Sequence, residues 1–461
     1  MIVLKFGGTS VGTAANLANV KRIVEGLDSP AVVVVSALGG LTDMLIATAK
    51  MAASGNQEYL KEMEAISLRH HNIVSDVIKP GAGLSTLAKI DPLLQDLKRL
   101  YDGVCLIGDL PERTLCQIVS LGERMSSIIV ADMIEGASHH DSLQFIKTEK
   151  WYDRNIAATE LTTELIQAEF TSDTKYPVVV GGFIATDKNT GEITNLGRGG
   201  SDYTAALIAA ALDAEVLQIW TDVDGFLTSD PRIIPEAHVV PRMSFVESMD
   251  LCTYGAKVIY PPTIYPVFHK NIPIRILNTF HPEVEGTYIA DSCEFKGIQR
   301  NDIAGISSLK GTSLFSLRGR LIANEQNVHS RAVNALSCQG ISILLMTQSP
   351  EETLFSFAID SRNSERAVRL LKEEFAPELV ERDLEVIEVT DRLATLAVVG
   401  DGIRNIPEIS NIIIDILELQ GIKVLAMSDK ASETTVSFVI YEDSVHEALS
   451  TLHTQFFTND K

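Results

Sequence analysis

The first apolar segment of the chain ends in a lysine and a glycine pair, a combination that suits an anion. Residues 2–6 are apolar except for Lys5, and the residues that follow are Gly7, Gly8, Thr9 and Ser10. Glycines at a strand end expose backbone N–H groups at the start of a helix, and the lysine adds a full positive charge. The pattern predicts an anion site, although a purely structural Gly-Gly turn would have the same sequence. A P-loop is excluded because G-x-x-x-x-G-K-[ST] occurs nowhere in the chain.

A second glycine cluster surrounds an arginine. Arg198 stands within Leu-Gly-Arg-Gly-Gly-Ser-Asp at 196–202, ahead of an alanine-rich segment that ends near Leu212. Glycines let a ligand approach the backbone, and arginine binds a carboxylate or phosphate through two parallel hydrogen bonds. The cluster therefore predicts a carboxylate or phosphate site, with a helix-capping loop as the alternative.

Three further positions carry polar residues where a ligand could bind. Thr221 and Asp222 follow a predicted strand at 216–220, and polar strand ends open onto the ligand face of an open α/β sheet. Lys257 follows a glycine at a predicted helix start. Glu123 is expected to open an apolar helix, where a helix N-terminal charge is the alternative to a ligand contact. The histidine pairs at 70–71 and 139–140 are predicted to lie at the surface.

Continuous apolar segments predict the sheet that positions these residues. They cover residues 2–6, 31–36, 178–183 and 216–220, and they alternate with helical stretches. Strands without a polar face are typical of a parallel sheet that is covered on both sides. Between Leu41 and Glu135 the apolar spacing is mostly helical. The fold class expected for this part is therefore α/β.

The last third of the chain contains an internal repeat. Residues 340–359 and 421–440 align without a gap at an offset of 81 and match at nine of 20 positions. In the same register, apolar helix positions correspond, with Ala367, Leu371 and Phe375 falling on Ala448, Leu452 and Phe456. Two copies of one strand–turn–strand–helix unit are predicted. They could be ligand sensors, or only packing and dimerisation modules.

Composition excludes several classes of function. The chain has 461 residues, a formal net charge of −22 and 45% hydrophobic residues, so it can bury large cores. An acidic chain is a poor general binder of nucleic-acid phosphates. The apolar segments are too short to span a bilayer, and because a strand pattern begins at Ile2, no targeting peptide is expected. The five cysteines have no CxxC spacing and are expected to be reduced, which predicts a cytoplasmic setting without a membrane or nucleic-acid partner.

Taken together, the motifs resemble a known family. KFGGTS at 5–10, GRGGSD at 197–202, WTDVDG at 220–225 and GAKV at 255–258 resemble the aspartokinases of the amino acid kinase superfamily, and the doubled C-terminal unit resembles their paired ACT domains. The resemblance implies an α/β/α sandwich kinase domain at 1–295 and two βαββαβ, ferredoxin-like ACT domains. The first ACT domain would cover 313–388, and the second would combine 297–312 with 391–461.

The resemblance also implies an activity. It is the ATP-dependent phosphorylation of the β-carboxylate of L-aspartate to 4-phospho-L-aspartate, the first step toward lysine, threonine and methionine. Mg²⁺ would arrive with ATP, and no other metal is expected. The partners implied are aspartate, ATP and a second copy of the chain, bound through the ACT domains.

The resemblance assigns roles to individual residues. Lys5 and Asp202 would be catalytic. The ATP contacts would be Lys5, Gly7, Gly8, Thr9, Ser10, Thr221, Asp222, Leu227, Arg232, Lys257 and Val258. The aspartate contacts would be Thr42, Glu123, Phe183, Arg198, Gly199 and Ser201. An effector would contact Gln348, Gly400 and Gly402; Leu344, where lysine-sensitive relatives have an acid, argues against lysine and for threonine or no effector.

Two departures from the family pattern keep alternatives open. Leu227 stands where relatives have a tyrosine, so an aromatic contact to the nucleotide would be missing. No G-x-G-x-x-G turn of a homoserine dehydrogenase occurs, which predicts a monofunctional kinase or an excised kinase portion. The alternatives are another amino acid kinase, acting on glutamate or acetylglutamate, and a non-catalytic ACT sensor of amino acids.

Overall fold

The computed structural model describes residues 1–79, 81–151, 154–295, 300–319, 327–349, 354–381, 384, 386–428 and 434–457. The chain forms two compact units. The first is Met1–Gly225 with Ile259–Glu294, and the second is Phe226–Val258 with Phe295–Lys461. The segment 226–258 therefore belongs to the second unit, although it lies inside the predicted 1–295 domain.

The first unit alternates strands and helices, as the apolar pattern predicts. Its strands are β1 (Ile2–Phe6), β2 (Ala31–Val35), β3 (Ser138–His140), β4 (Lys147–Trp151), β5 (Arg154–Ala157), β6 (Val178–Gly181), β7 (Ile184–Asp187), β8 (Ile193–Asn195), β9 (Val216–Thr221), β11 (Ile274–Asn278) and β12 (Thr287–Ala290). Its helices are α1 (Ala14–Glu25), α2 (Leu41–Ala53), α3 (Tyr59–Val77), α4 (Gly83–Ile107), α5 (Glu112–Met133), α6 (Thr159–Glu169), α7 (Gly200–Ala211) and α9 (Tyr265–Phe268).

The main sheet of this unit is parallel at its centre, which confirms the prediction. Its strand order is β12-β11-β9-β1-β2-β6-β3, and β1 pairs in parallel with both β2 and β9. A smaller sheet has the order β5-β4-β7-β8. Because β1, β2 and β6 carry almost only apolar residues, they are buried on both faces.

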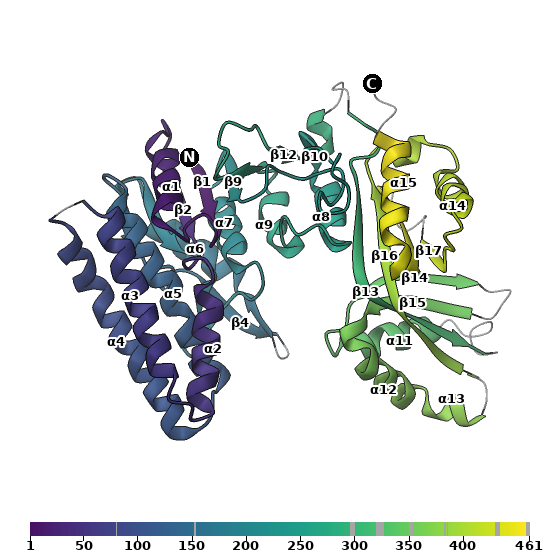
Figure 1. The fold of residues 1–461 in the computed structure, drawn as a ribbon, viewed down its shortest axis with the longest axis horizontal. Helices are drawn as coiled ribbons and strands as arrows, with labels where there is room; N and C mark the ends of the chain where they lie inside the picture. The colour runs from purple at the N-terminus through teal and green to yellow at the C-terminus, as the bar shows by residue number, and fades with distance from the viewer. Residues whose placement is uncertain are drawn as a thin grey trace. The chain divides into compact units, whose positions relative to one another are not determined.

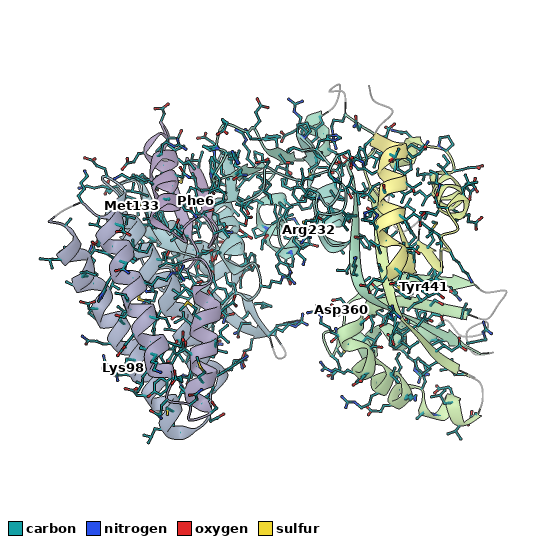
Figure 2. The ribbon with its side chains drawn as sticks, in the orientation of Figure 1. Phe6, Lys98, Met133, Arg232, Asp360 and Tyr441 are labelled. Carbon is teal, nitrogen blue, oxygen red and sulfur yellow. The ribbon has the colours of Figure 1, made fainter. Side chains whose placement is uncertain are left out.

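Helices cover both faces of the main sheet. Successive side chains of a strand point to opposite faces. Leu4 and Phe6 share a core with the helices α1–α5, which Figure 1 shows grouped beside the sheet. Figure 2 marks Phe6, which is fully buried. Lys5 points to the other face, which α7 covers along β1, β2 and β9. The α/β/α sandwich expected for this part is the observed architecture.

The second unit is built on one six-stranded sheet in the order β14-β15-β13-β16-β18-β17. The strands of this sheet are β13 (Gly305–Arg318), β14 (Ile343–Ser349), β15 (Leu354–Asp360), β16 (Val386–Val399), β17 (Ala426–Ser428) and β18 (Thr435–Tyr441). The unit also contains the short strand β10 (Arg242–Ser244), which lies outside this sheet. Its helices are α8 (Phe245–Thr253), α11 (Asn327–Ser337), α12 (Ser364–Glu374), α13 (Ala376–Glu381), α14 (Ile409–Leu419) and α15 (Val445–Phe457).

The internal repeat appears as two halves of this sheet. The pairs β14–β15 and β17–β18 are the equivalent hairpins, and α12 and α15 follow them. Gly340 and Gly421, which correspond in the repeat, both have a φ of 72°. The helices α11 and α12 cover one half, and α14 and α15 cover the other (Figure 1). The predicted strand–turn–strand–helix repeat is therefore present.

The two halves share their longest strands. The first part of β13, Gly305–Lys310, pairs with Ala394–Val399 of β16, which in turn pairs with β18. After a register shift near Thr312, the rest of β13 pairs with β15. Leu314, Ala358, Leu393 and Val439 form a core on the faces that the helices leave uncovered, which joins the halves.

A network of charged residues joins the start of α8 to Asp401, which follows β16. Glu247 is fully buried, and its carboxylate accepts hydrogen bonds from the backbone amides of Ser244 (2.6 Å) and Asp401 (2.8 Å). Arg300 forms an ion pair with the same carboxylate and lies 3.5 Å from Asp401. Removing one member of such a buried group is costly, because the others keep unpaired charge.

Some local predictions are wrong. The helix expected to begin near Glu123 begins at Glu112, so Glu123 lies in the middle of α5. Because α5 is buried around most of its circumference, a charged residue within it does not indicate where the helix begins. Lys257 follows the end of α8 rather than starting a helix, since Gly255 has a φ of 119°, a conformation that ends a helix. His70 is fully buried in α3, where burial lowers its pKa to about 4.

In the described residues, no helix is long and apolar enough to cross a membrane.

Candidate active site

A pocket opens where β1, β2 and β6 end and where α2 and α7 begin. It has a volume of about 370 Å³. It is lined by Lys5, Gly8, Ser36, Ala37, Leu38, Gly40, Thr42, Glu123, Phe183, Gly197, Arg198, Gly199, Gly200, Ser201 and Asp202. Two helix N-termini meet here, and both present backbone N–H groups without an intrahelical acceptor. Such ends favour anions, so the pocket suits carboxylates and phosphates.

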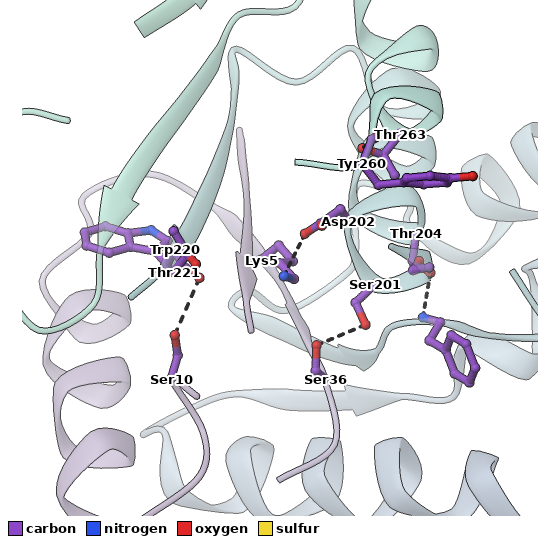
Figure 3. Close-up of polar contacts among 12 residues, drawn as sticks. Lys5, Ser10, Ser36, Ser201, Asp202, Thr204, Trp220, Thr221, Tyr260 and Thr263 are labelled. Atoms are coloured by element: carbon purple, nitrogen blue, oxygen red, sulfur yellow. Dashed lines mark hydrogen bonds and ion pairs between the residues drawn. The ribbon is translucent and has the colours of Figure 1, made fainter. Parts of the chain in front are cut away.

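An ion pair between Lys5 and Asp202 spans the pocket wall. Lys5 Nζ lies 2.7 Å from Asp202 Oδ1, and the two side chains are only 11% and 13% exposed (Figure 3). Lys5 is held level with Val34 and Ile219 by the sheet. Asp202 lies in the first turn of α7, which begins after Gly199. The aspartate therefore orients an ammonium group that faces the cavity.

Close backbone approaches shape the wall around α7. A Cβ atom on Gly199 would lie 2.6 Å from Tyr260 Cβ, and one on Gly182 would lie 2.7 Å from Ser201 Cα. Phe183 has a φ of 69°, which is unusual for an aromatic residue. Its amide donates to Thr204 Oγ1 at 3.0 Å, and this bond fixes the backbone at a residue that lines the pocket. Strained residues of this kind persist where the surrounding structure fixes them.

Glu123 is a buried carboxylate with a free oxygen. It is 3% exposed, and its Oε1 accepts a bond of 3.4 Å from the amide of Ala37. In the part of the chain that the structure describes, Oε2 has no hydrogen-bond partner. Desolvation by burial raises the pKa of this carboxyl to about 8. A ligand ammonium placed beside Glu123 would restore its charged form.

The remaining predicted aspartate contacts also lie on this pocket. Ser201 Oγ accepts from Ser36 Oγ at 3.0 Å (Figure 3), and Thr42 is in the first turn of α2. Arg198 is exposed on the loop before α7. The lining thus combines Lys5 and Arg198 with two carboxylates, so a zwitterionic ligand with several charges fits it.

The glycine turn after β1 contributes less than its sequence predicts. Gly8 lines the pocket, but the amide of Gly7 already donates to the carbonyl of Trp220 at 3.3 Å. Ser10 is fully buried, and its hydroxyl lies 2.7 Å from that of Thr279. Figure 3 shows Ser10 turned toward Trp220. Thr9 is exposed and is not part of the lining.

Other predicted ATP contacts lie outside the pocket lining. Thr221 ends β9 and donates to Asp222 Oδ1 at 3.2 Å. Leu227, Arg232, Lys257 and Val258 belong to the second unit. There the structure brings two cations together around one carboxylate: Arg232 donates to Asp230 at 2.9 and 2.6 Å, and Arg232 and, to a smaller extent, Lys257 lower the pKa of Asp230.

The predicted effector residues have structural partners within the second unit. The amide of Gly400 donates to Thr434, and that of Gly402 donates to Asp302. A Cβ atom on either glycine would lie 2.2 Å from an oxygen of Asp302. Close packing against Asp302 therefore accounts for both glycines, and neither amide is free to bind an effector in this conformation. Gln348 is exposed on β14.

Sequence reasoning missed the loop after β2. Ser36, Ala37, Leu38 and Gly40 all line the pocket. The signal was present, because this loop, like the one after β1, follows an apolar strand and contains a glycine pair, Gly39 and Gly40. Nothing in the sequence indicated which faces of these loops would point to the cavity.

Comparison with known proteins identifies the family to which this chain belongs. The family model for the amino acid kinase family matches residues 1–278, and the model for the ACT domain matches residues 315–375 and 396–456. The chain therefore belongs to the amino acid kinase family and carries ACT domains.

Its relatives in that family are aspartokinases. It is 33% identical over 470 residues to a bifunctional aspartokinase/homoserine dehydrogenase of Haemophilus influenzae, covering 100% of this chain and 57% of that protein. It is 29% identical over 472 residues to the chloroplastic aspartokinase 1 of Arabidopsis thaliana, covering 99% and 80%. The chain spans just over half the length of the bifunctional relatives.

Solved structures of aspartate kinases have the same fold. Escherichia coli aspartokinase III in complex with aspartate and ADP gives a TM-score of 0.81 at 25% identity, covering 99% of this chain and 100% of that one. The aspartate kinase of Clostridium acetobutylicum gives a TM-score of 0.80 at 25% identity, with the same coverage.

The raised pKa of Glu123 predicts a pH dependence of stability. The carboxyl titrates near 4.5 ordinarily and near 8 in the folded chain, so the folded state holds the proton more tightly. This contribution to stability is complete below about pH 4.5 and is lost as pH rises to about 8, with a slope of at most about 1.4 kcal/mol per pH unit. Glu123→Gln should remove this decline and be more stable than the wild type above pH 8. Denaturation at several pH values measures it; equal slopes in both proteins would contradict it. Glu64→Gln, on the exposed surface of α3, is the control.

Proposed function

We propose that this protein transfers the γ-phosphoryl group of ATP to the β-carboxylate of L-aspartate, which yields 4-phospho-L-aspartate. The observation that carries the proposal is that one pocket is lined both by the Lys5–Asp202 ion pair and by the buried carboxyl of Glu123, whose Oε2 has no hydrogen-bond partner among the described residues. An amino-acid substrate has an ammonium for Glu123 and carboxylates for cationic groups. The similarity to aspartokinases supports aspartate as that substrate. The step would be the first toward lysine, threonine and methionine.

The geometry suits this reaction because phosphoryl transfer needs positioning and charge neutralisation rather than covalent catalysis. Glu123 would take the α-ammonium of aspartate, and Arg198, with the N-terminal amides of α2, would bind carboxylate oxygens. Lys5 would neutralise the charge that develops on the transferring phosphoryl group. Asp202 would keep the Lys5 ammonium aimed at that position, with Gly8, Gly199 and Ser201 lining the wall.

ATP would approach from the Lys5 end of the pocket. Thr221 and Asp222 at the end of β9, and Leu227, Arg232, Lys257 and Val258, remain the proposed nucleotide contacts. The described residues contain no group of three His, Cys, Asp or Glu side chains that could hold a metal. Mg²⁺ usually takes one or two carboxylates plus phosphate oxygens, and Asp202 offers one carboxylate at this end. When bound, the ion neutralises phosphate charge.

Two other functions fit part of the structure. A kinase for glutamate or acetylglutamate would use the same cations. Acetylglutamate has no ammonium group, however, and would leave the carboxylate of Glu123 without a charged partner. A non-catalytic sensor would need the ACT domains but not the Lys5–Asp202 pair. The tandem ACT domains and the aspartokinase relatives favour the aspartate kinase.

Lys5→Ala should reduce kcat by ~10²–10³, or about 3–4 kcal/mol, because one preorganised cation at the phosphoryl position is lost. A coupled assay of ADP release with ATP and aspartate, glutamate or acetylglutamate measures the effect and also tests the substrate. Lys61→Ala, on the exposed side of α3, is the matched control. A kcat within about threefold of the wild type would remove Lys5 from the mechanism.

Arg198→Lys should raise KM for aspartate and leave KM for ATP nearly unchanged. Lysine keeps the charge but cannot form two parallel hydrogen bonds to a carboxylate. Steady-state kinetics with each substrate varied in turn give the two constants, and the ATP constant serves as the internal control. A rise in KM for ATP alone would show that Arg198 was assigned to the wrong substrate.

The proposal includes a homodimer formed through the ACT domains. The strand β14 is the last strand at one end of the sheet order, and Met346 on it is 50% exposed, so an apolar side chain of this strand is available to a second copy of the chain. Light scattering at micromolar concentration should give at least twice the chain mass of 50.3 kDa. A mass of one chain would exclude the dimer.

A further inference from the structure

Two loops bring the proposed substrates together. The β1 loop (Gly7–Gly12) follows β1 and contributes Gly8 to the pocket, and the β2 loop (Ser36–Gly40) contributes Ser36, Ala37, Leu38 and Gly40 and leads to Thr42. By the proposed function, the first loop faces the phosphoryl group and the second faces aspartate. The distance between them therefore sets the distance between the reacting atoms.

The two loops touch through their backbones. A Cβ atom on Gly39 would lie 2.8 Å from the carbonyl oxygen of Gly8, and one on Gly8 would lie 3.3 Å from that of Ala37. A Cβ atom on Gly12 would lie 3.5 Å from Gly39 Cα. Packing of this kind prevents closer approach, but it does not prevent the loops from separating.

One side chain outside the pocket ties the loops to each other. Arg69 Nη2 donates to the carbonyl of Gly39 at 2.6 Å in the β2 loop and to that of Gly12 at 3.3 Å in the β1 loop. Its Nη1 lies 3.8 Å from Met44 Sδ in α2. Within the residues that the structure describes, no carboxylate forms an ion pair with Arg69, so its charge is directed at the loop carbonyls.

The helix that carries Arg69 is a rigid support. Ile66 and His70 of α3 are fully buried in the core of the first unit, and Ile73 is nearly so. His70 Nδ1 lies 2.8 Å from the carbonyl of Ile66 within the helix. Because these buried residues fix α3 against the core, the backbone of Arg69 is fixed as well. Its guanidinium can therefore hold both loops in place.

We propose that Arg69 is a positioning residue that sets the spacing between the phosphoryl-facing β1 loop and the aspartate-facing β2 loop. It touches neither substrate and acts through the carbonyls of Gly12 and Gly39. The predicted effect of Arg69 on turnover rests on the proposed function. The tie between the loops can be measured without any activity.

The kinetic test compares Arg69→Gln and Arg69→Lys with the wild type. A misplacement near 1 Å can cost about 10²-fold in rate, so Arg69→Gln should lower kcat by about that factor. Both KM values should stay within about threefold, because no substrate contact is removed. Lysine keeps the charge, but its side chain is one atom shorter and its ammonium would not reach the position of Nη2, so Arg69→Lys should fall between the two. Arg99→Gln, whose side chain is 74% exposed on α4, is the control and should behave as wild type.

Hydrogen exchange gives the readout that is independent of turnover. In Arg69→Gln, peptides covering residues 7–13 and 36–41 should exchange faster than in the wild type, while α4 should be unchanged. Circular dichroism shows whether the variant is folded. If Arg69→Gln does not fold, Arg69→Lys carries the same comparison. Guanidinium added to Arg69→Ala should restore part of the turnover.

The outcomes separate this inference from the proposed function. Faster exchange in both loops with a lower kcat and steady KM values supports it. Unchanged exchange, or a kcat within about threefold of the wild type, overturns it. If the wild type phosphorylates none of the amino acids tested, the proposed function fails, and the exchange comparison still decides whether Arg69 ties the loops.

Discussion

The parallel register of the central strands is the constraint on which the site depends. Phe6 is level with both Val35 and Trp220, and Val35 is level with Gly181, so β1, β2, β6 and β9 end at one edge of the sheet. Each chain then leaves through a turn at the same edge. A shift of one residue in β1 would turn Lys5 to the face covered by α1–α5, away from Asp202. The whole charged pocket therefore rests on backbone pairing among apolar residues.

Within that frame, the charges of the pocket differ in how they are held. Lys5 and Asp202 form an ion pair within the protein, so the carboxylate holds the ammonium in place at the pocket wall before any ligand binds. Glu123 is the opposite case. Its burial holds a proton on the carboxyl near neutral pH, and only a cationic partner would favour the charged form. The pocket thus favours ligands that carry an ammonium as well as anionic groups.

The second unit links its ACT domains to the segment 226–258. The carboxylate of Glu247 accepts from the amide of Asp401, and Asp250 accepts from the hydroxyls of Thr434 and Thr435 at 2.8 and 2.5 Å. The hydroxyl of Tyr254 donates to the carbonyl of Leu344 in the other half at 3.2 Å. Arg232 and Lys257 lie on this same segment. The segment that carries these two residues is therefore hydrogen-bonded to both halves of the ACT sheet.

The sequence alone determined the local features: the apolar strands of the parallel sheet, the repeat of the ACT domains, and most residues of the pocket through their glycine-rich motifs. These follow from side-chain type and spacing, which act over a few residues. Only the tertiary structure decided that Glu123 lies mid-helix with a free oxygen, that the Gly7 amide and the Ser10 hydroxyl are already bonded, and that Gly400 and Gly402 pack on Asp302. Each of these contacts depends on groups that are distant in the sequence and that only the fold brings close. Arg69 is the clearest case, because its role comes from two carbonyls, 57 and 30 positions away, that no local pattern brings to it.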